Sequence, residues 1–335
     1  MPQKSTITLP TGDAQIWFKD EAIVNLAKAM SVDHNIEIDC IHEGPCLESA
    51  GLYKILDLLC DTFDYNKNRI TIKGICNQLE QHDRYVIKIN APLKHVRKLQ
   101  DDLKKSPTVY KIFDANIKHF GNFTSRGSRN RLLIGSYLHS NYKDKTIQTY
   151  HCNIKDDYHK ASIFFDELLW STPSVGYADN AYKFLTSVTP IKFEEEQIES
   201  YPIRDYKMYG INAAYPRIFV DIVCQTYCQG TTFYIDEKVW RPIMMKTPFI
   251  VQGPVHFINN FKKLGFKTFN RWWDENYSEA PWNMQVYNIL KIIDGLSKLS
   301  IKQLTNIYEE MKPTLDYNYE KFMNLSTADF KVLNR

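Results

Sequence analysis

Apolar positions along the first third of the chain switch between the two-residue period of strands and the roughly 3.6-residue period of helices. Leu52, Ile55, Leu56 and Leu59 recur at helical spacing, whereas residues 35–41 alternate as a strand does. The pattern predicts strands at 5–9, 15–18, 35–41, 69–75 and 85–89, and helices at 21–30, from 52, and at 91–105. Such alternation predicts a parallel sheet with helices on both faces.

A second alternation begins near residue 118. It predicts strands at 119–124, 146–153, 218–225 and 248–252, helices at 130–139, 161–170, 237–245 and 255–264, and closing helices at 284–299, 301–311 and 319–323. We therefore expect two Rossmann-like α/β domains, residues 1–115 and 116–335. Ligands of open parallel sheets bind beyond the carboxyl ends of the strands, so functional residues should follow strands.

Composition agrees with a globular protein. Of 335 residues, 44% are apolar and 13% aromatic, and no apolar run is long enough to span a membrane. The N-terminus lacks a signal-peptide core. The 7 cysteines include no Cys-x-x-Cys, so they indicate neither a disulfide framework nor a zinc site. We expect a cytoplasmic protein without a membrane partner, a metal or a required cofactor.

Charge changes this picture, because it is unevenly spread. Between Lys67 and Lys145 the chain has 17 Lys and Arg against 6 Asp and Glu, although its net charge is only +3. A basic central third indicates a polyanionic partner or a phosphate-bearing ligand. A solvated lysine-rich surface is the alternative.

Residues 123–131 read Phe-Thr-Ser-Arg-Gly-Ser-Arg-Asn-Arg between a predicted strand and a predicted helix. Small residues such as Ser125 let a phosphate approach the backbone, and a helix N-terminus favours anions. Arg126, Arg129 and Arg131 can add bidentate bonds to a diphosphate. A solvated basic loop would have the same composition.

Another candidate segment runs from Thr232 to Pro242, where Glu237 and Lys238 open a predicted helix and Tyr234 and Arg241 flank them. A carboxylate can accept bonds from ribose hydroxyls, and a cation can neutralise a leaving diphosphate. A glutamate that only complements the helix dipole is the alternative.

Candidates for a catalytic base follow the early strands. Glu43 comes just after the strand at 35–41 and Glu80 after the strand at 69–75, where either carboxylate can deprotonate an acceptor hydroxyl. His42, Glu48, His82 and Asp83 are rivals, and an ordinary exposed polar role is the alternative for each.

Together these segments resemble the GT-B glycosyltransferases related to α1,3-fucosyltransferases. That family has a Ser- and Arg-containing turn, here residues 123–131, and a Tyr-x-Thr-Glu-Lys element, here Tyr234-Ile-Asp-Glu-Lys238. The resemblance covers about residues 118–277. It implies that Glu237 binds the ribose, that Lys238 and Arg131 hold the diphosphate, and that the final helix returns to the first domain.

Two positions depart from the family pattern. Gln225 stands where that family usually has Glu, and Asp236 stands where it usually has Thr. These departures leave the donor and the stereochemistry open.

The chain is also similar to viral glycosyltransferases, through Asn77-Gln-Leu-Glu80, Gly265-Phe-Lys-Thr-Phe269 and Asp274-Glu-Asn-Tyr277. Some phage enzymes of this kind glycosylate hydroxymethylated pyrimidines in DNA. We therefore expect a hexosyl- or pentosyltransferase that uses a UDP-sugar, with hydroxymethylcytosine in double-stranded phage DNA as the acceptor. A surface glycan as acceptor, or a non-enzymatic nucleic-acid-binding protein on this fold, are the alternatives.

Overall fold

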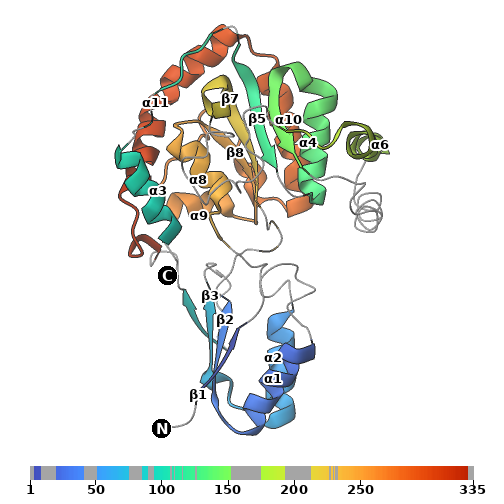
Figure 1. Ribbon diagram of the computed structural model, residues 1–335, viewed down its shortest axis with the longest axis vertical. Coiled ribbons are helices and arrows are strands. Elements are labelled where there is room, and N and C mark those ends of the chain that lie inside the picture. Colours follow the sequence, from blue (N-terminus) through green and yellow to red (C-terminus); the bar gives the residue numbers. More distant parts are fainter. Residues whose placement is uncertain are drawn as a thin grey trace.

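The structure is a computed structural model that describes residues 4–8, 20–40, 51–74, 85–89, 94–105, 108, 110–114, 116–124, 127–151, 175–192, 213–225, 228, 230 and 233–330. These residues form two four-stranded parallel sheets with helices, each sheet in its own body (Figure 1). The predicted parallel α/β class is confirmed. Within the described ranges, no helix is long and apolar enough to cross a membrane.

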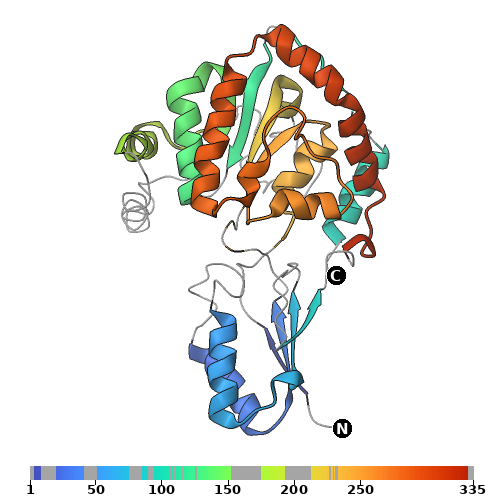
Figure 2. The ribbon, with the colours of Figure 1, turned by 180° about the vertical axis from the view of Figure 1, so that it is seen from behind.

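The first sheet has the strand order β1-β2-β3-β4. Its strands are β1 (Lys4–Thr8), β2 (Asn35–Cys40), β3 (Ile70–Gly74) and β4 (Val86–Ile89). Helices α1 (Asp20–Ser31) and α2 (Leu52–Phe63) both lie on one face of this sheet (Figures 1 and 2).

The alternation of side chains explains which face of the first sheet the helices cover. Ile36 and Ile38 are fully buried, and their register partners Ile70 and Ile72 share their core. The residues between them face the other way, where Lys73 forms an ion pair with Glu37. Our prediction of helices on both faces is therefore wrong for the described part of this sheet, because its second face is polar.

The second sheet has the order β6-β5-β7-β8. Its strands are β5 (Lys118–Thr124), β6 (Thr146–Tyr150), β7 (Ile218–Cys224) and β8 (Phe249–Gln252). All residues of β7 are buried, as expected for a central strand covered on both faces.

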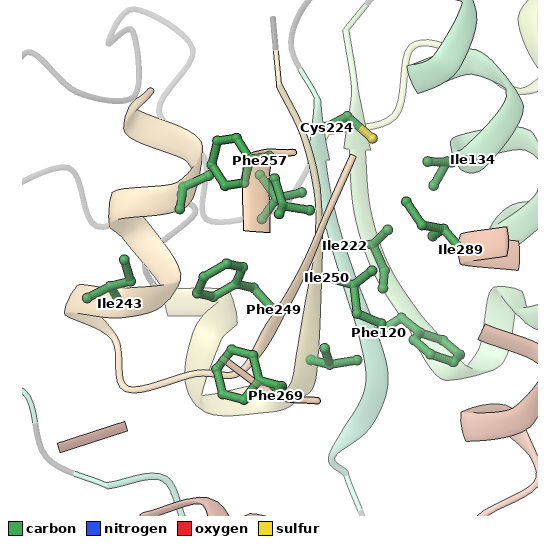
Figure 3. Packing of buried hydrophobic residues seen from close by; sticks show 14 of the residues in the cluster. Phe120, Ile134, Ile222, Cys224, Ile243, Phe249, Ile250, Phe257, Phe269 and Ile289 are labelled. Atoms are coloured by element: carbon green, nitrogen blue, oxygen red, sulfur yellow. The ribbon is translucent and has the colours of Figure 1, made fainter. Parts of the chain in front are cut away.

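Helices do cover both faces of this second sheet. Figure 3 shows Ile222 and Ile250 on the side of Ile289, and Phe249 on the side of Ile243. The first side belongs to α4 (Arg129–Tyr142) and α10 (Trp282–Ser297), and the second to α8 (Glu237–Met244) and α9 (Phe257–Lys263). A further helix, α6 (Val175–Lys183), packs beside α4.

The remaining helices, α3 (Lys94–Lys105) and α11 (Ile301–Met323), lie side by side on the second body (Figures 1 and 2). Gln100 of α3 donates from Nε2 to the backbone oxygens of Phe322 (2.7 Å) and Leu325 (3.2 Å). Although α3 falls within residues 1–115, its buried side chains join the core of the second sheet. The last helix thus meets the first third of the chain through α3.

Most predicted elements are present, with some differences. The predicted break between 311 and 319 is wrong: α11 is continuous through Pro313, because its buried stripe of Leu304, Tyr308, Met311, Leu315 and Tyr319 keeps the helical period. Helix α6 was not predicted. The predicted strand at 15–18 and helix at 161–170 lie outside the described residues.

Candidate functional site

The strand order of the second sheet indicates where a ligand-binding site is expected. After β5, the chain forms β6 on one side of it and then returns to form β7 on the other. Such a reversal is a topological switch point, and ligands of doubly wound sheets bind beyond the carboxyl ends of the strands there. The described strands of the first sheet follow chain order and contain no reversal. Functional side chains are therefore expected beyond the carboxyl ends of β5 and β7.

Arg131 lies at this switch point. It belongs to the first turn of α4, which follows β5, and only 4% of the residue is exposed. Its Nη2 donates to the backbone oxygen of Cys224, at the end of β7, over 3.3 Å. The N-cap residue Ser128 makes no side-chain capping bond to α4. A guanidinium beside an uncapped helix N-terminus suits an anionic ligand.

We call the region beyond the carboxyl ends of β5 and β7 the edge of the second sheet. Glu237 and Lys238 lie beside this edge, at the start of α8. Asp236 caps this helix by accepting from the backbone N of Lys238 over 3.0 Å. The Lys238 ammonium lies 3.0 Å from Asp236 Oδ2 and 2.6 Å from Glu237 Oε1. The Lys238 and Glu237 side chains are 11% and 18% exposed, so both still reach the surface.

Electrostatics keep this pair charged. Burial opposes ionisation of Glu237, but Lys238 and Arg241 outweigh it and lower the pKa of its carboxyl. Burial also opposes protonation of Lys238, but Asp236 and Glu237 raise its pKa overall. Arg131 is near enough for its charge to oppose that rise. The charges of Arg131 and Lys238, the predicted diphosphate-binding residues, therefore influence each other, although many residues separate them in sequence.

The two departures from the fucosyltransferase pattern contact each other. With its amide nitrogen turned toward the carboxylate, Gln225 donates to Asp236 Oδ2 over 3.0 Å and lies 3.3 Å from Oδ1. Gln225 thus links the end of β7 to the N-cap of α8. The two residues that depart from the family pattern are therefore bonded to each other.

Arg241 is buried rather than open to the edge, with 4% exposure. Its charge acts on Glu237, one helical turn earlier, and on the carboxyl of Asp221 inside β7. Tyr215 donates from its hydroxyl to Asp221 Oδ2 over 2.7 Å. Arg241 thus supports Glu237 from within the core. Tyr234 is half-buried in the segment that leads into α8.

Four predicted site residues, Glu43, Glu80, Ser125 and Arg126, lie outside the described residues. Arg129, from the same motif as Arg131, stacks its guanidinium 3.8 Å from the ring centre of Trp282.

Sequence reasoning missed a set of amides behind this edge. Gln252 ends β8 with no exposed surface, and Asn130 follows Arg129 in α4 with 3% exposure. Asn130 donates from Nδ2 to the sulfur of Cys228 over 2.9 Å. The available signal was a polar residue at the end of an otherwise apolar strand.

Three described cations of the basic region bond within the protein. Lys67 lies 3.0 Å from Asp57 and Arg69 pairs with Asp33, both in the first body. Lys111 is half-buried at the amino end of β7, where it donates to the oxygen of Ile218 over 2.7 Å.

No protein-family model, curated protein or solved structure was found to match this chain. Among the described residues, no group of three or more His, Cys, Asp or Glu side chains is arranged to hold a metal ion. Inference about function therefore depends on the edge itself: two cations and a carboxylate at a switch point.

Proposed function

We propose that this protein is a glycosyltransferase that moves a sugar from a nucleotide-sugar donor, a UDP-sugar, to a hydroxyl group. The observation that supports this most is a chain of contacts beyond the central strands of the second sheet. Arg131 bonds to Cys224 at the end of β7, and the next residue, Gln225, contacts the N-cap of the helix that carries Glu237 and Lys238. Arg131, Glu237 and Lys238 are the three residues to which the sequence resemblance assigns diphosphate and ribose binding.

The chemistry needs such an arrangement. As the bond from the sugar to the diphosphate breaks, negative charge builds on the leaving oxygen, and cations fixed in advance stabilise it. In our proposal the Arg131 guanidinium binds two phosphate oxygens, while Lys238 acts as a point charge. Because Glu237 is held ionised, its carboxylate can accept hydrogen bonds from the ribose hydroxyls.

A base must also remove the proton of the acceptor hydroxyl. We propose a carboxylate from the first third of the chain, Glu43 or Glu80, for this step. For the acceptor we propose the hydroxymethyl group of hydroxymethylcytosine in duplex DNA. This acceptor is supported by the excess of Lys and Arg in the sequence and by the resemblance to viral enzymes. The internal ion pairs of Lys67 and Arg69 reduce the charge that is open to DNA.

The proposal is tested in two stages. Thermal stabilisation by UDP, GDP and ADP, followed by hydrolysis of the matching nucleotide-sugars, tests the donor. Absence of both for every nucleotide would refute the glycosyltransferase and leave the binding-protein alternative. Mass spectrometry then follows hydroxymethylcytosine DNA incubated with the protein and the hydrolysed donor.

A mass gain of one sugar on that DNA, absent from unmodified cytosine DNA and from the Glu237→Ala variant, is the expected result. Donor hydrolysis without any gain on DNA would reject the DNA acceptor and favour a glycan.

A further inference from the structure

Gln252 is buried at the end of β8 with both polar atoms of its side chain unused. None of its surface is exposed, and within the described part of the chain neither Oε1 nor Nε2 has a hydrogen-bond partner. Its backbone carbonyl is bonded to the neighbouring strand, since it accepts from Gln225 N over 2.9 Å. The side chain, not the strand, is therefore what lacks a partner.

A second amide in the same state lies next to it. The Oδ1 atom of Asn130 is also buried without a partner, while its Nδ2 bonds to Cys228. Burial raises the pKa of the Cys228 thiol, and the amides of Gln252 and Asn130 both oppose that rise. The Cys228 sulfur therefore lies near both amides, but only Asn130 makes a hydrogen bond to it, and Gln252 makes none. Arg131 acts on the same thiol, so the diphosphate-binding cation is adjacent.

An unpaired buried amide destabilises a folded protein, because it loses its hydrogen bonds to water and gains none. An apolar side chain of the same size at residue 252 would avoid this loss, and the rest of β8 is apolar. Functional sites are where proteins keep such unfavourable residues, because a bound ligand can complete their bonding.

We infer that Gln252 and Asn130 form a neutral subsite beside Arg131, which takes an uncharged part of the ligand that presents a hydrogen-bond donor and an acceptor side by side. This inference rests on the proposed function. In a nucleotide-sugar, such a group is either the edge of the nucleobase or neighbouring hydroxyls of the sugar. A side-chain amide complements either, because it offers one acceptor and an NH₂ donor in one plane.

The test compares Gln252→Met, which keeps the length but removes both polar atoms, with a matched control. Gln100→Met changes a buried glutamine whose amide is bonded, on α3. Calorimetry measures the affinity of each variant for UDP, GDP, ADP, UDP-glucose and inorganic pyrophosphate, and thermal unfolding measures each Tm without ligand.

For Gln252→Met we expect the affinity for the preferred nucleoside diphosphate to fall about tenfold or more, with pyrophosphate binding unchanged. Its Tm should stay the same or rise by about 2–4 °C, because the unpaired atoms are gone. Gln100→Met should lower Tm and leave every affinity unchanged. If the sugar occupies the subsite, the loss appears with UDP-glucose and not with UDP.

Wild-type affinity of Gln252→Met for all five probes would overturn the subsite and indicate that water fills it. A lower Tm with parallel loss for pyrophosphate would overturn it as well, in favour of a structural role. If the wild-type protein binds none of the probes, the proposed function fails and the subsite fails with it.

Discussion

The Arg131 guanidinium bonds to the backbone oxygen of Cys224 over 3.3 Å, so a side chain from the helix after β5 touches the end of β7. These two strands flank the switch point of the second sheet. The bond fixes the guanidinium at the end of β7, where its charge acts on Lys238, the partner of Glu237. An arginine that is buried and oriented in advance loses little freedom when it binds an anion.

Arg131→Ala should lower turnover strongly, because it removes a cation that stabilises the leaving diphosphate. Arg131→Lys keeps the charge but cannot form two parallel hydrogen bonds, so its turnover should lie between that of Arg131→Ala and that of wild type. Steady-state kinetics measures this, with Arg271→Ala as the control, since Arg271 is 72% exposed and pairs with Glu310. Activity of Arg131→Ala within about threefold of wild type, or less than about 1 kcal/mol of barrier, would remove this role.

Glu237→Gln separates two roles of this carboxylate, because Glu237 both faces the edge and neutralises Lys238. If it binds the ribose, the affinity for UDP should fall about tenfold. The affinity for pyrophosphate should rise, because Lys238 loses a counter-charge. Calorimetry with the two ligands measures both effects. Tighter binding of UDP and pyrophosphate alike would mean that Glu237 only balances Lys238.

Asp221→Asn should change how stability depends on pH. Burial raises the pKa of Asp221 to about 7, against the opposing effects of Tyr215, Arg241 and Lys111. An unfolded aspartate titrates near about 4, so between these values the folded state holds more protons than the unfolded state. Its stabilisation is therefore present at low pH and lost as pH rises through 7.

Urea unfolding at several pH values tests this through the difference between wild type and Asp221→Asn, which cannot titrate. The free energy of unfolding of wild type, relative to the variant, should fall between about pH 4 and about pH 7 and stay level above that. Asp179→Asn, at an exposed ion pair with Lys183, is the surface control. A difference for Asp221→Asn that does not change with pH would show that its carboxyl has an ordinary pKa.

Ser300→Ala should destabilise the protein by about 0.5–2 kcal/mol, because it removes the N-cap of α11. Ser300 and Gln303 form a capping box, with Gln303 N donating to Ser300 Oγ over 3.3 Å and Ser300 N donating back to Gln303 Oε1 over 2.9 Å. Thr305→Ala, which removes a hydroxyl bonded within the same helix, is the control. Equal urea midpoints for the two variants would contradict a capping role.

Local pattern was sufficient where one period dominates. The strands at β5, β7 and β8 and the helices at α4, α8 and α10 were predicted close to their observed bounds, because apolar spacing reports which face is buried. The pairing of Glu237 with Lys238 was also readable, since the two residues are neighbours.

Other features depend on contacts between segments far apart in the chain. Nothing in the local sequence predicts that α3 packs on the second core. The same holds for the bond from Arg131 to Cys224 and for the contact of Gln225 with Asp236. Gln252 is the clearest case, because only its burial beside Asn130 and Cys228 distinguishes it from an ordinary polar residue that ends a strand. The sequence by itself determined the periods, and thus the elements and the candidate charges. Tertiary structure alone decided which charges meet and which amides lose water, because both depend on packing across the sheet rather than on spacing along the chain.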